Sequence, residues 1–226
     1  MQLKKLCEFC DEYLQVNEFN DYCPNGLQVE ANSRVEHIVC GVTASQALIE
    51  AAIEQGADTL LVHHGYFWKG ESQPISGYKG RRISSLIKNN INLLAYHLPL
   101  DAHPEVGNNV QLGRIMGWNT SASFGEQDLV LEGSLAQAQT LDEVSRQIEA
   151  NLATTALSIS AGDHPVERIA WCTGAAQGFI EAAAERGVDA FVSGEISVPT
   201  VHLARELGIH YIAAGHHASE RYGVQA

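Results

Sequence analysis

The stretch Asp58-Thr-Leu-Leu-Val-His63-His64-Gly65 gives the strongest indication of how this chain folds. Residues 59–62 are apolar apart from the β-branched Thr59, and such a run is typical of a short strand covered on both faces. The carboxyl end of a buried parallel strand lies at the crevice where α/β proteins bind ligands. Two adjacent imidazoles at that end are therefore expected to be metal ligands or acid–base groups.

On both sides of this stretch, short apolar strands alternate with amphipathic helices. Strands are predicted over residues 35–42, 59–62, 91–96, 166–172, 190–193 and 209–213. Helices are predicted over residues 2–16, 45–55, 81–89, 110–116, 175–186 and 199–207. Residues 97–109 are predicted to form a loop, because Pro99 disfavours helical geometry at Leu98. The alternation predicts an α/β fold with largely parallel sheets.

The chain contains an internal repeat. At an offset of 131 residues, segments 46–58 and 177–189 are identical at eight of 13 positions. Alanine richness raises this count somewhat, but not enough to explain it. The repeat predicts duplicated α/β units over residues 35–109 and 166–226.

The residues between the two copies have a different character. Strands are expected over residues 128–135 and 155–160, and Thr140 followed by Glu143 is a capping-box signature that starts a helix between them. This pattern indicates a small inserted α+β subdomain. The expected organisation is a metal-binding α/β domain of residues 1–117 with 165–226, and an inserted subdomain of residues 118–164.

Composition excludes several classes of protein. With 27 acidic and 14 basic residues among 226, the net charge of −13 argues against nucleic-acid binding. No run of 18 apolar residues is present, so we expect no membrane span and a cytoplasmic protein. Five scattered cysteines do not indicate a disulfide framework, and Cys7 and Cys10 fit a core helical stripe better than half a zinc motif.

Imidazoles and carboxylates recur at the ends of the predicted strands. At an offset of 119 residues, His97-x-x-x-Asp101 aligns with His216-x-x-x-Glu220. Parallel strands share their carboxyl edge, so the topology is expected to gather these side chains along one rim. The residues concerned are His63, His64, His97, Asp101, Glu195, His216 and Glu220.

Such a donor set suits Zn, Mn, Fe, Co or Ni as divalent ions. A bridging carboxylate would hold two of them about 3.5–4 Å apart, as hydrolytic two-metal sites do. Other interpretations remain open, since His63 and His64 alone could bond loop carbonyls, and Glu195 could cap the helix that follows it. Successive strand residues face opposite ways, so His63 and His64 are expected to serve different metals.

Several motifs resemble those of dinuclear metal centre proteins of the YbgI type, which are widely named GTP cyclohydrolase I type 2 homologues. The matching motifs run across nearly the whole chain and are Asp21-Tyr-Cys-Pro-Asn-Gly-Leu-Gln-Val29, Val62-His-His-Gly65, Tyr96-His-Leu-Pro-Leu-Asp-Ala-His103, Ser193-Gly-Glu-Ile-Ser197 and Gly215-His-His-Ala-Ser-Glu220. Members of this family usually continue as a helix after the last motif, whereas this sequence stops six residues after Glu220. The positioning of Glu220 is therefore expected to depend on packing and on metal.

The resemblance implies two divalent metal ions per subunit and a homohexameric ring whose sites face an internal cavity. The metal ligands that it implies are His63, His64, Asp101, His216 and Glu220. Together with the residue pattern, it predicts a metal-dependent hydrolase of a nucleotide or related small molecule, with Glu195 or His97 as the proton-transfer group. The alternative is a metal-binding scaffold or regulatory oligomer without catalysis.

Overall fold

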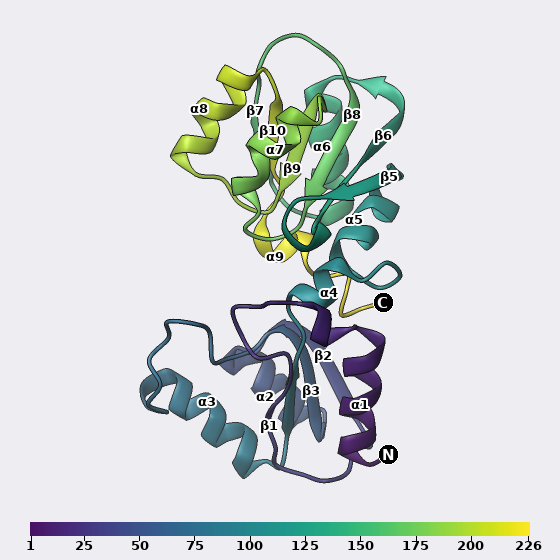
Figure 1. The fold of residues 1–226 in the computed structure, drawn as a ribbon. Coiled ribbons are helices and arrows are strands. Elements are labelled where there is room, and N and C mark those ends of the chain that lie inside the picture. Colours follow the sequence, from purple (N-terminus) through teal and green to yellow (C-terminus); the bar gives the residue numbers. More distant parts are fainter. The chain divides into compact units, whose positions relative to one another are not determined.

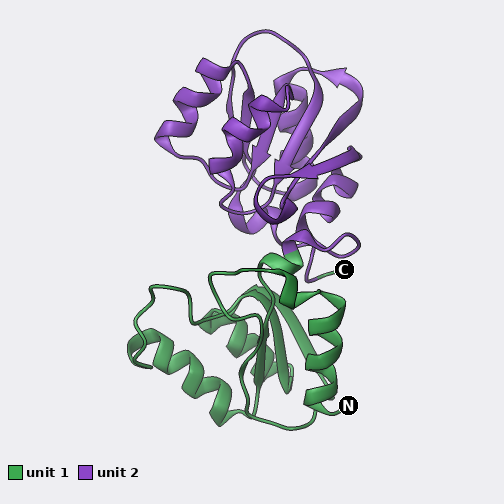
Figure 2. Ribbon diagram, viewed as in Figure 1, with its two compact units in different colours: residues 1–100, 225 green, residues 101–224, 226 purple.

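The computed structural model describes all 226 residues, and the α/β chain divides into two compact units (Figure 2). Unit 1 comprises Met1–Leu100 with Gln225, and unit 2 comprises Asp101–Val224 with Ala226. The longest helices have 12 residues, and none is long and apolar enough to cross a membrane.

Unit 1 is built on a four-stranded sheet in the order β1–β4–β3–β2 (Figure 1). Strands β2, β3 and β4 are parallel, and β1 pairs antiparallel with β4 at the edge. The strands are β1 (Gly26–Val29), β2 (Ile38–Thr43), β3 (Thr59–His64) and β4 (Asn92–Ala95). The helices are α1 (Leu3–Tyr13), η1 (Val16–Glu18), α2 (Gln46–Glu54), α3 (Gly77–Lys88) and α4 (Leu98–Ala102), which contains the boundary between the units.

Apolar packing fixes the centre of this sheet. Leu60, Val62 and Leu93 have no exposed surface and pack in one core with Ile49 of α2 and Leu86 of α3. Burial of side chains of this size stabilises the fold by roughly 1.5–3 kcal/mol each. Strand β3 is therefore held between β2 and β4, which determines where its two terminal histidines lie.

Unit 2 is built on a six-stranded sheet in the order β5–β6–β8–β9–β10–β7, with helices on both faces (Figure 1). Strands β8, β9 and β10 are parallel, and the others pair antiparallel. The strands are β5 (Asn119–Phe124), β6 (Val130–Gln139), β7 (Leu157–Ile159), β8 (Val166–Cys172), β9 (Ala190–Ser193) and β10 (His210–Ala213). The helices are α5 (Asn108–Met116), η2 (Glu126–Asp128), α6 (Leu141–Leu152), η3 (Gln177–Phe179), α7 (Ile180–Glu185), α8 (Val198–Leu207) and α9 (His216–Ser219).

The core of unit 2 contains a tryptophan whose polar atom is satisfied. Trp171 is fully buried, and its indole N–H donates to the carbonyl of Asn109 at 2.8 Å. The ring of Trp118 packs against it, with centroids 5.1 Å apart. Trp171 therefore connects β8 to the start of α5, the helix that carries polar residues of the candidate site.

The same hydrogen bonds recur in the two units. In unit 1, Asp58 Oδ2 accepts the backbone N–H groups of Glu36 and His37 at 2.7 and 3.1 Å. In unit 2, Asp189 Oδ2 accepts two backbone N–H groups, from Glu167 and Arg168, at 2.9 and 2.8 Å. In each unit, one aspartate before a central parallel strand thus binds the backbone around the start of the preceding strand.

The α/β fold class predicted from the sequence is confirmed, but the division of the chain differs from the one expected. Residues 118–164 do not form a body of their own, because β6 bonds to β8 and β7 bonds to β10 within one sheet. The expected domain of residues 1–117 with 165–226 is divided between the units, since unit 1 ends at Leu100 and Asp101–Val224 belongs to unit 2.

The prediction that residues 97–109 form a loop was wrong at the start of this segment. Residues 98–102 form the short helix α4. Pro99 lies in its first turn, where the N–H group that proline lacks has no partner in a helix, so little is lost.

Candidate metal centre

Two histidines end β3, as the sequence predicted. His63 is fully buried, and its Nδ1 donates to the carbonyl of Tyr96 at 3.0 Å, so Nε2 is the nitrogen that a metal would use. The Nδ1 of His64 lies 3.3 Å from the hydroxyl of Thr43. Metal-binding histidines are commonly oriented in this way by a partner on the other ring nitrogen.

A third imidazole in unit 1 belongs to His97, which follows β4. Its Nδ1 lies 2.7 Å from Asp21 Oδ1. Asp21 also accepts the backbone N–H of Leu98 at 2.9 Å and the side-chain amide of Asn25 at 2.9 Å. Burial opposes ionisation of Asp21, but the hydrogen bond and charge of His97 and these donors outweigh it, so the pKa of Asp21 is lowered.

The three imidazoles of unit 1 converge. His63, His64 and His97 each offer one nitrogen, and the three atoms lie within 4.8 Å of one another. The ring centroid of His97 is 5.1 Å from that of His63 and 5.6 Å from that of His64. The indole ring of Trp68 packs edge-on against His97, with centroids 4.9 Å apart. The set is thus preformed and bordered on one side by an aromatic residue.

A thiol lies beside this set. Cys23 is buried, and its sulfur lies within 4.8 Å of a carboxylate oxygen of Asp21 and a ring nitrogen of His97. Burial, followed by the charge of Asp21, raises the pKa of Cys23 to about 12. The neutral thiol is therefore its ordinary state.

In unit 2, Asp101 is a buried and oriented carboxylate. It is 7% exposed, and its Oδ1 accepts the side-chain amide of Asn108 at 2.9 Å and the hydroxyl of Thr173 at 3.2 Å. Asn108 begins α5 and Thr173 follows β8. Both neighbours contact Oδ1, so Oδ2 is the oxygen that a metal would use.

His216 lies between two carboxylates of unit 2. Its Nδ1 is 2.7 Å from Glu195 Oε1, and its Nε2 is 3.1 Å from Glu220 Oε2. The hydrogen bond with Glu220 is the main cause that raises the pKa of His216 to about 9, against the opposing effect of burial. A metal ion at this point would take the place of the Nε2 proton, because imidazole binds metals only when that nitrogen is deprotonated.

The absence of a side chain at Gly174 leaves room for the carboxylate of Glu220. Glu220 is 2% exposed and follows α9. Gly174 has φ of +68°, and a Cβ built on it would lie 2.2 Å from Glu220 Oε1. Glycine is therefore required at position 174, both by its backbone and by the carboxylate beside it.

The donor sets fit a divalent transition metal. Unit 1 offers three imidazoles and unit 2 offers an imidazole and two buried carboxylates, so both suit Zn, Mn, Fe, Co or Ni. The residues predicted as ligands fall into both units: His63 and His64 in unit 1, and Asp101, His216 and Glu220 in unit 2.

Two expectations about individual residues need comment. His63 and His64 were expected to face opposite ways along the strand and to serve different metals. Their ring centroids are 4.4 Å apart, and their assignment to different metals stays a prediction. Glu195 was open to a capping role, yet Ser197 and not Glu195 is the N-cap residue of α8, and Glu195 bonds His216.

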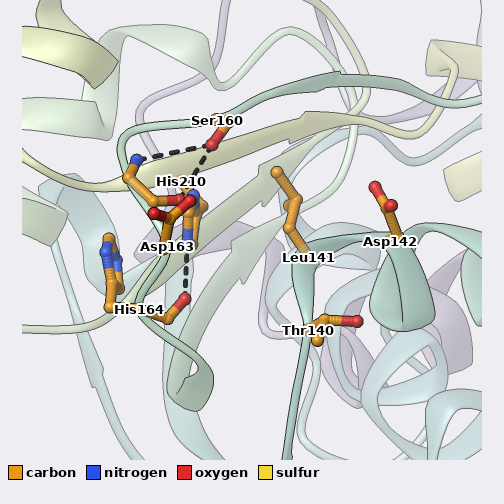
Figure 3. Close-up of a pocket in the computed structure, with 8 residues that line it drawn as sticks. Thr140, Leu141, Asp142, Ser160, Asp163, His164 and His210 are labelled. Atoms are coloured by element: carbon orange, nitrogen blue, oxygen red, sulfur yellow. Dashed lines mark hydrogen bonds between the residues drawn. The ribbon is translucent and has the colours of Figure 1, made fainter.

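None of the candidate ligands lines a pocket of about 260 Å³ that lies elsewhere in unit 2 (Figure 3). Its wall includes His210, which is 1% exposed and stacks on His164 with ring centroids 4.0 Å apart. Nδ1 of His210 accepts the N–H of Ala161 at 3.1 Å, and Nε2 donates to the carbonyl of His164 at 2.9 Å. Because both nitrogens bond the backbone, His210 supports this loop and offers no nitrogen to a ligand.

A family model described as Duf34/NIF3 (NGG1p interacting factor 3) matches residues 1–226. The chain belongs to this family. The resemblance inferred from the five sequence motifs is thereby confirmed.

Relatives of this DUF34/NIF3 protein agree in sequence and in fold. A GTP cyclohydrolase 1 type 2 homolog of Pseudomonas aeruginosa is 55% identical over 227 residues, covering 99% of this chain and 90% of the relative. Its counterpart in Escherichia coli K12 is 49% identical and covers 100% of this chain and 91% of the relative. The solved structure of protein ybgI, titled as of unknown function, has a TM-score of 0.97 at 49% identity, covering 100% of this chain and 91% of that one.

Sequence reasoning missed the residues that orient the candidate ligands of this DUF34/NIF3 protein. Asp21 lies in a motif that carried the resemblance, but no role was assigned to it. Thr43, Asn108 and Thr173 lie in other segments and carry no pattern of their own. Their contacts depend on which strand ends and helix starts meet, which a single sequence does not specify.

Proposed function

We propose that this DUF34/NIF3 protein is a metal-dependent hydrolase with two divalent metal ions per subunit. The proposed ligands are His63, His64, Asp101, His216 and Glu220. One observation carries the proposal: ligands in both units are already oriented by hydrogen bonds on the atom that a metal would not use. Tyr96 does this for His63, and Asn108 with Thr173 does it for Asp101.

A bound pair of divalent ions would supply Lewis acidity and lower the pKa of a water molecule. The chain's own residues would orient the reactants and move protons. Glu195 is the group that we assign to proton transfer, because its side chain is 45% exposed and its carboxylate lies 2.7 Å from His216 Nδ1. The sequence also offered His97 for proton transfer, but the side chain of His97 is only 12% exposed and its Nδ1 lies 2.7 Å from Asp21 Oδ1.

The proposed substrate is a nucleotide or a related small molecule. The relatives' name, GTP cyclohydrolase 1 type 2 homolog, points to a nucleotide. Trp68 supports a flat substrate, since its indole ring lies 5.8 Å from the ring of His64, centroid to centroid, and could stack a base.

The alternative is a metal-binding scaffold or regulatory oligomer. The family description, NGG1p interacting factor, is an observation in its favour. Assembly as a homohexamer, expected from the resemblance, is compatible with both functions, as is a cytoplasmic location. Light scattering of the purified protein tests assembly, with a mass near six times the 24.5 kDa chain expected.

A turnover assay separates the two functions. The metal-loaded protein is assayed against a panel of nucleotides and phosphoesters beside Asp101→Asn/Glu220→Gln, in which both amides retain the shape of the carboxylates. The control is His202→Ala, an exposed histidine of α8. We expect turnover in wild type and control, reduced at least about a hundredfold in the double variant. Absence of turnover that depends on Asp101 and Glu220 would favour the scaffold.

A further inference from the structure

Three consecutive aromatic residues follow β3, and only the third lies beside the histidines of unit 1. Tyr66 is 4% exposed, and its hydroxyl donates to the carbonyl of Ala44 at 2.8 Å. Phe67 packs against the apolar core of unit 1. The ring of Trp68 is instead half-buried and lies edge-on to His97, with centroids 4.9 Å apart. Core packing therefore explains the first two rings but not the position of Trp68.

A second aromatic ring lies beside the same histidine. Tyr22 is 56% exposed, and its ring centroid is 5.9 Å from that of His97. The backbone N–H of Lys69 donates to the carbonyl of Tyr22 at 2.6 Å, so the segments that carry Tyr22 and Trp68 are joined. Two rings from different segments thus border the histidines of unit 1, and both have exposed surface.

The turn that carries Trp68 is held by a buried ammonium group. Lys79 of α3 is 5% exposed, and its Nζ donates to the carbonyl of Ser72 at 2.5 Å and lies 3.3 Å from Glu71 Oε1. The other oxygen, Glu71 Oε2, accepts the backbone N–H of Trp68 at 3.1 Å. The ammonium also lies 5.6 Å from the centre of the Phe67 ring, within the range of a cation–π contact. One lysine thus contacts residues on both sides of Trp68.

The backbone immediately before Trp68 is strained. Phe67 has φ of +66°, in the left-handed region that favours glycine. A bulky residue keeps such a conformation only where neighbouring contacts hold it there, and strain of this kind is common at ligand-binding sites. An aromatic wall that is already held in place loses little conformational freedom when a ligand binds, which favours affinity.

The chemistry of the two rings favours a planar ligand. Exposed aromatic side chains bind flat rings by stacking and bind cations through the charge distribution of the ring. A divalent ion at the neighbouring histidines, as in the proposed function, would repel a cation. An uncharged planar heterocycle is therefore the class of ligand that fits, and stacking on aromatic side chains tolerates different bases.

We propose that Trp68 and Tyr22 form a recognition site for the planar base of a nucleoside, and that the ion pair of Lys79 with Glu71 positions Trp68 for it. The proposal rests on the proposed function for the class of ligand, but it concerns binding and not turnover. It gives unit 1 a role in substrate recognition besides the binding of metal.

Fluorine NMR of the full chain labelled with fluorotryptophan tests this assignment. The chain has three tryptophans, and the signal of Trp68 is the one that disappears in Trp68→Phe. The protein is titrated in the presence of Zn²⁺ with guanosine and with adenosine, and ribose phosphate serves as the probe that lacks a base. We expect both nucleosides to shift the Trp68 signal in a saturable way and ribose phosphate to leave it unchanged. An equal response to ribose phosphate, or no saturable shift, overturns the proposal.

Substitutions of the two rings test their contribution to affinity. Trp68→Ala is expected to weaken guanosine binding at least about tenfold by calorimetric titration, and Trp68→Phe, which retains a ring, less than that. Tyr22→Ala should weaken binding about fivefold, whereas Tyr22→Phe should match wild type. The control is Tyr13→Ala, at an exposed tyrosine of α1, and it should leave affinity unchanged. Affinity that is indifferent to Trp68→Ala overturns the proposal.

Lys79→Met tests the positioning role, because methionine has a similar length and no charge. The Trp68 signal of this variant should broaden or split before any nucleoside is added, and affinity for guanosine should fall about fivefold. The control, Lys88→Met, replaces an exposed lysine at the end of the same helix. A purely structural role would lower the thermal midpoint and leave the Trp68 signal and the affinity of the folded protein unchanged, which would refute the positioning role.

This proposal and the hydrolase proposal can fail separately. If nucleosides bind at Trp68 while no nucleotide is turned over, the hydrolase proposal fails and the recognition site stands. If turnover depends on Asp101 and Glu220 but is indifferent to Trp68→Ala, the recognition site fails and the hydrolase proposal stands.

Discussion

At the scale of single residues, the candidate centre shows how far side-chain type and position can be read from sequence. The residue types were informative, since imidazoles and carboxylates after apolar strands indicated metal ligands before any contact was known. The sequence did not show which of these side chains lie together, because the direction of a ring at a strand end depends on the neighbouring hydrogen bonds. His63 turns to the Tyr96 carbonyl and His64 to the Thr43 hydroxyl, and the two rings come together despite alternation.

Gly174 provides a residue-scale prediction. In Gly174→Ala, the new Cβ would meet Glu220 Oε1 and displace the carboxylate, so we expect metal affinity to fall about tenfold by calorimetric titration. The control is Gly208→Ala, which has a similar φ of +70° and nothing within 4 Å of the added Cβ. Both variants should lose about 1 kcal/mol of stability from the left-handed backbone. Equal metal affinity in the two would contradict the role given to Gly174.

At the scale of elements, local pattern predicted the strands best. β8 and β9 have the predicted bounds, since each is a short apolar run that the sheet buries. The capping box of Thr140 and Glu143 is formed at the start of α6. β5 was missed because its sequence, Asn-Thr-Ser-Ala-Ser-Phe, is polar and pairs only at the edge beside β6. Such a strand is stabilised by its partner and not by its own pattern.

The ion pair of Glu132 and Arg186 gives an element-scale prediction, because it ties β6 to the end of α7. Arg186 donates from Nε and Nη2 to the two carboxylate oxygens, at 2.8 and 2.6 Å. The hydrogen bond with Arg186, partly opposed by burial, lowers the pKa of Glu132 from its ordinary 4.5. A lowered pKa contributes stability above the unfolded value, and that contribution is lost as pH falls through the folded value.

Glu132→Gln should therefore unfold at a lower temperature than wild type at neutral pH. The difference should shrink once the pH drops below about 4.5, as the wild-type carboxyl becomes protonated. Thermal scans between pH 3 and pH 7, in steps of about one unit, measure it. Glu126→Gln, at an exposed glutamate, serves as the control. A difference that stays constant down to pH 3 would rule out the ion pair as its source.

At the scale of the whole chain, fold class was predictable and the division into units was not. Alternating strands and helices indicated α/β architecture. Residues 118–164 resembled an insertion because a strand–helix–strand pattern stands between the two copies of the repeat. They belong instead to the sheet of unit 2, since β6 and β7 complete its hydrogen bonding on either side of the parallel strands. Hydrogen bonding between strands that are far apart in the sequence cannot be predicted from a short window of residues.

Metal removal tests the whole molecule. An ion that binds only the folded chain stabilises it by about 2.7 kcal/mol when its free concentration is 100 times Kd. Stripping the protein with a chelator should therefore lower its thermal midpoint, and added Zn²⁺ or Mn²⁺ should restore it. A chain carrying His63→Ala, His64→Ala, Asp101→Asn, His216→Ala and Glu220→Gln, in which every proposed ligand is replaced, should show no such response. A chelator effect of the same size in that chain would place the metal elsewhere.

Asp58 and Asp189 make the same contact with the backbone in the two units, and this contact separates what the two copies share from what differs between them. It anchors the beginning of a strand, whereas the reactive side chains follow the strand's other end. The two copies therefore share the contact at the start of a strand and differ at its end, where one has His63-His64 and the other Gly194-Glu195.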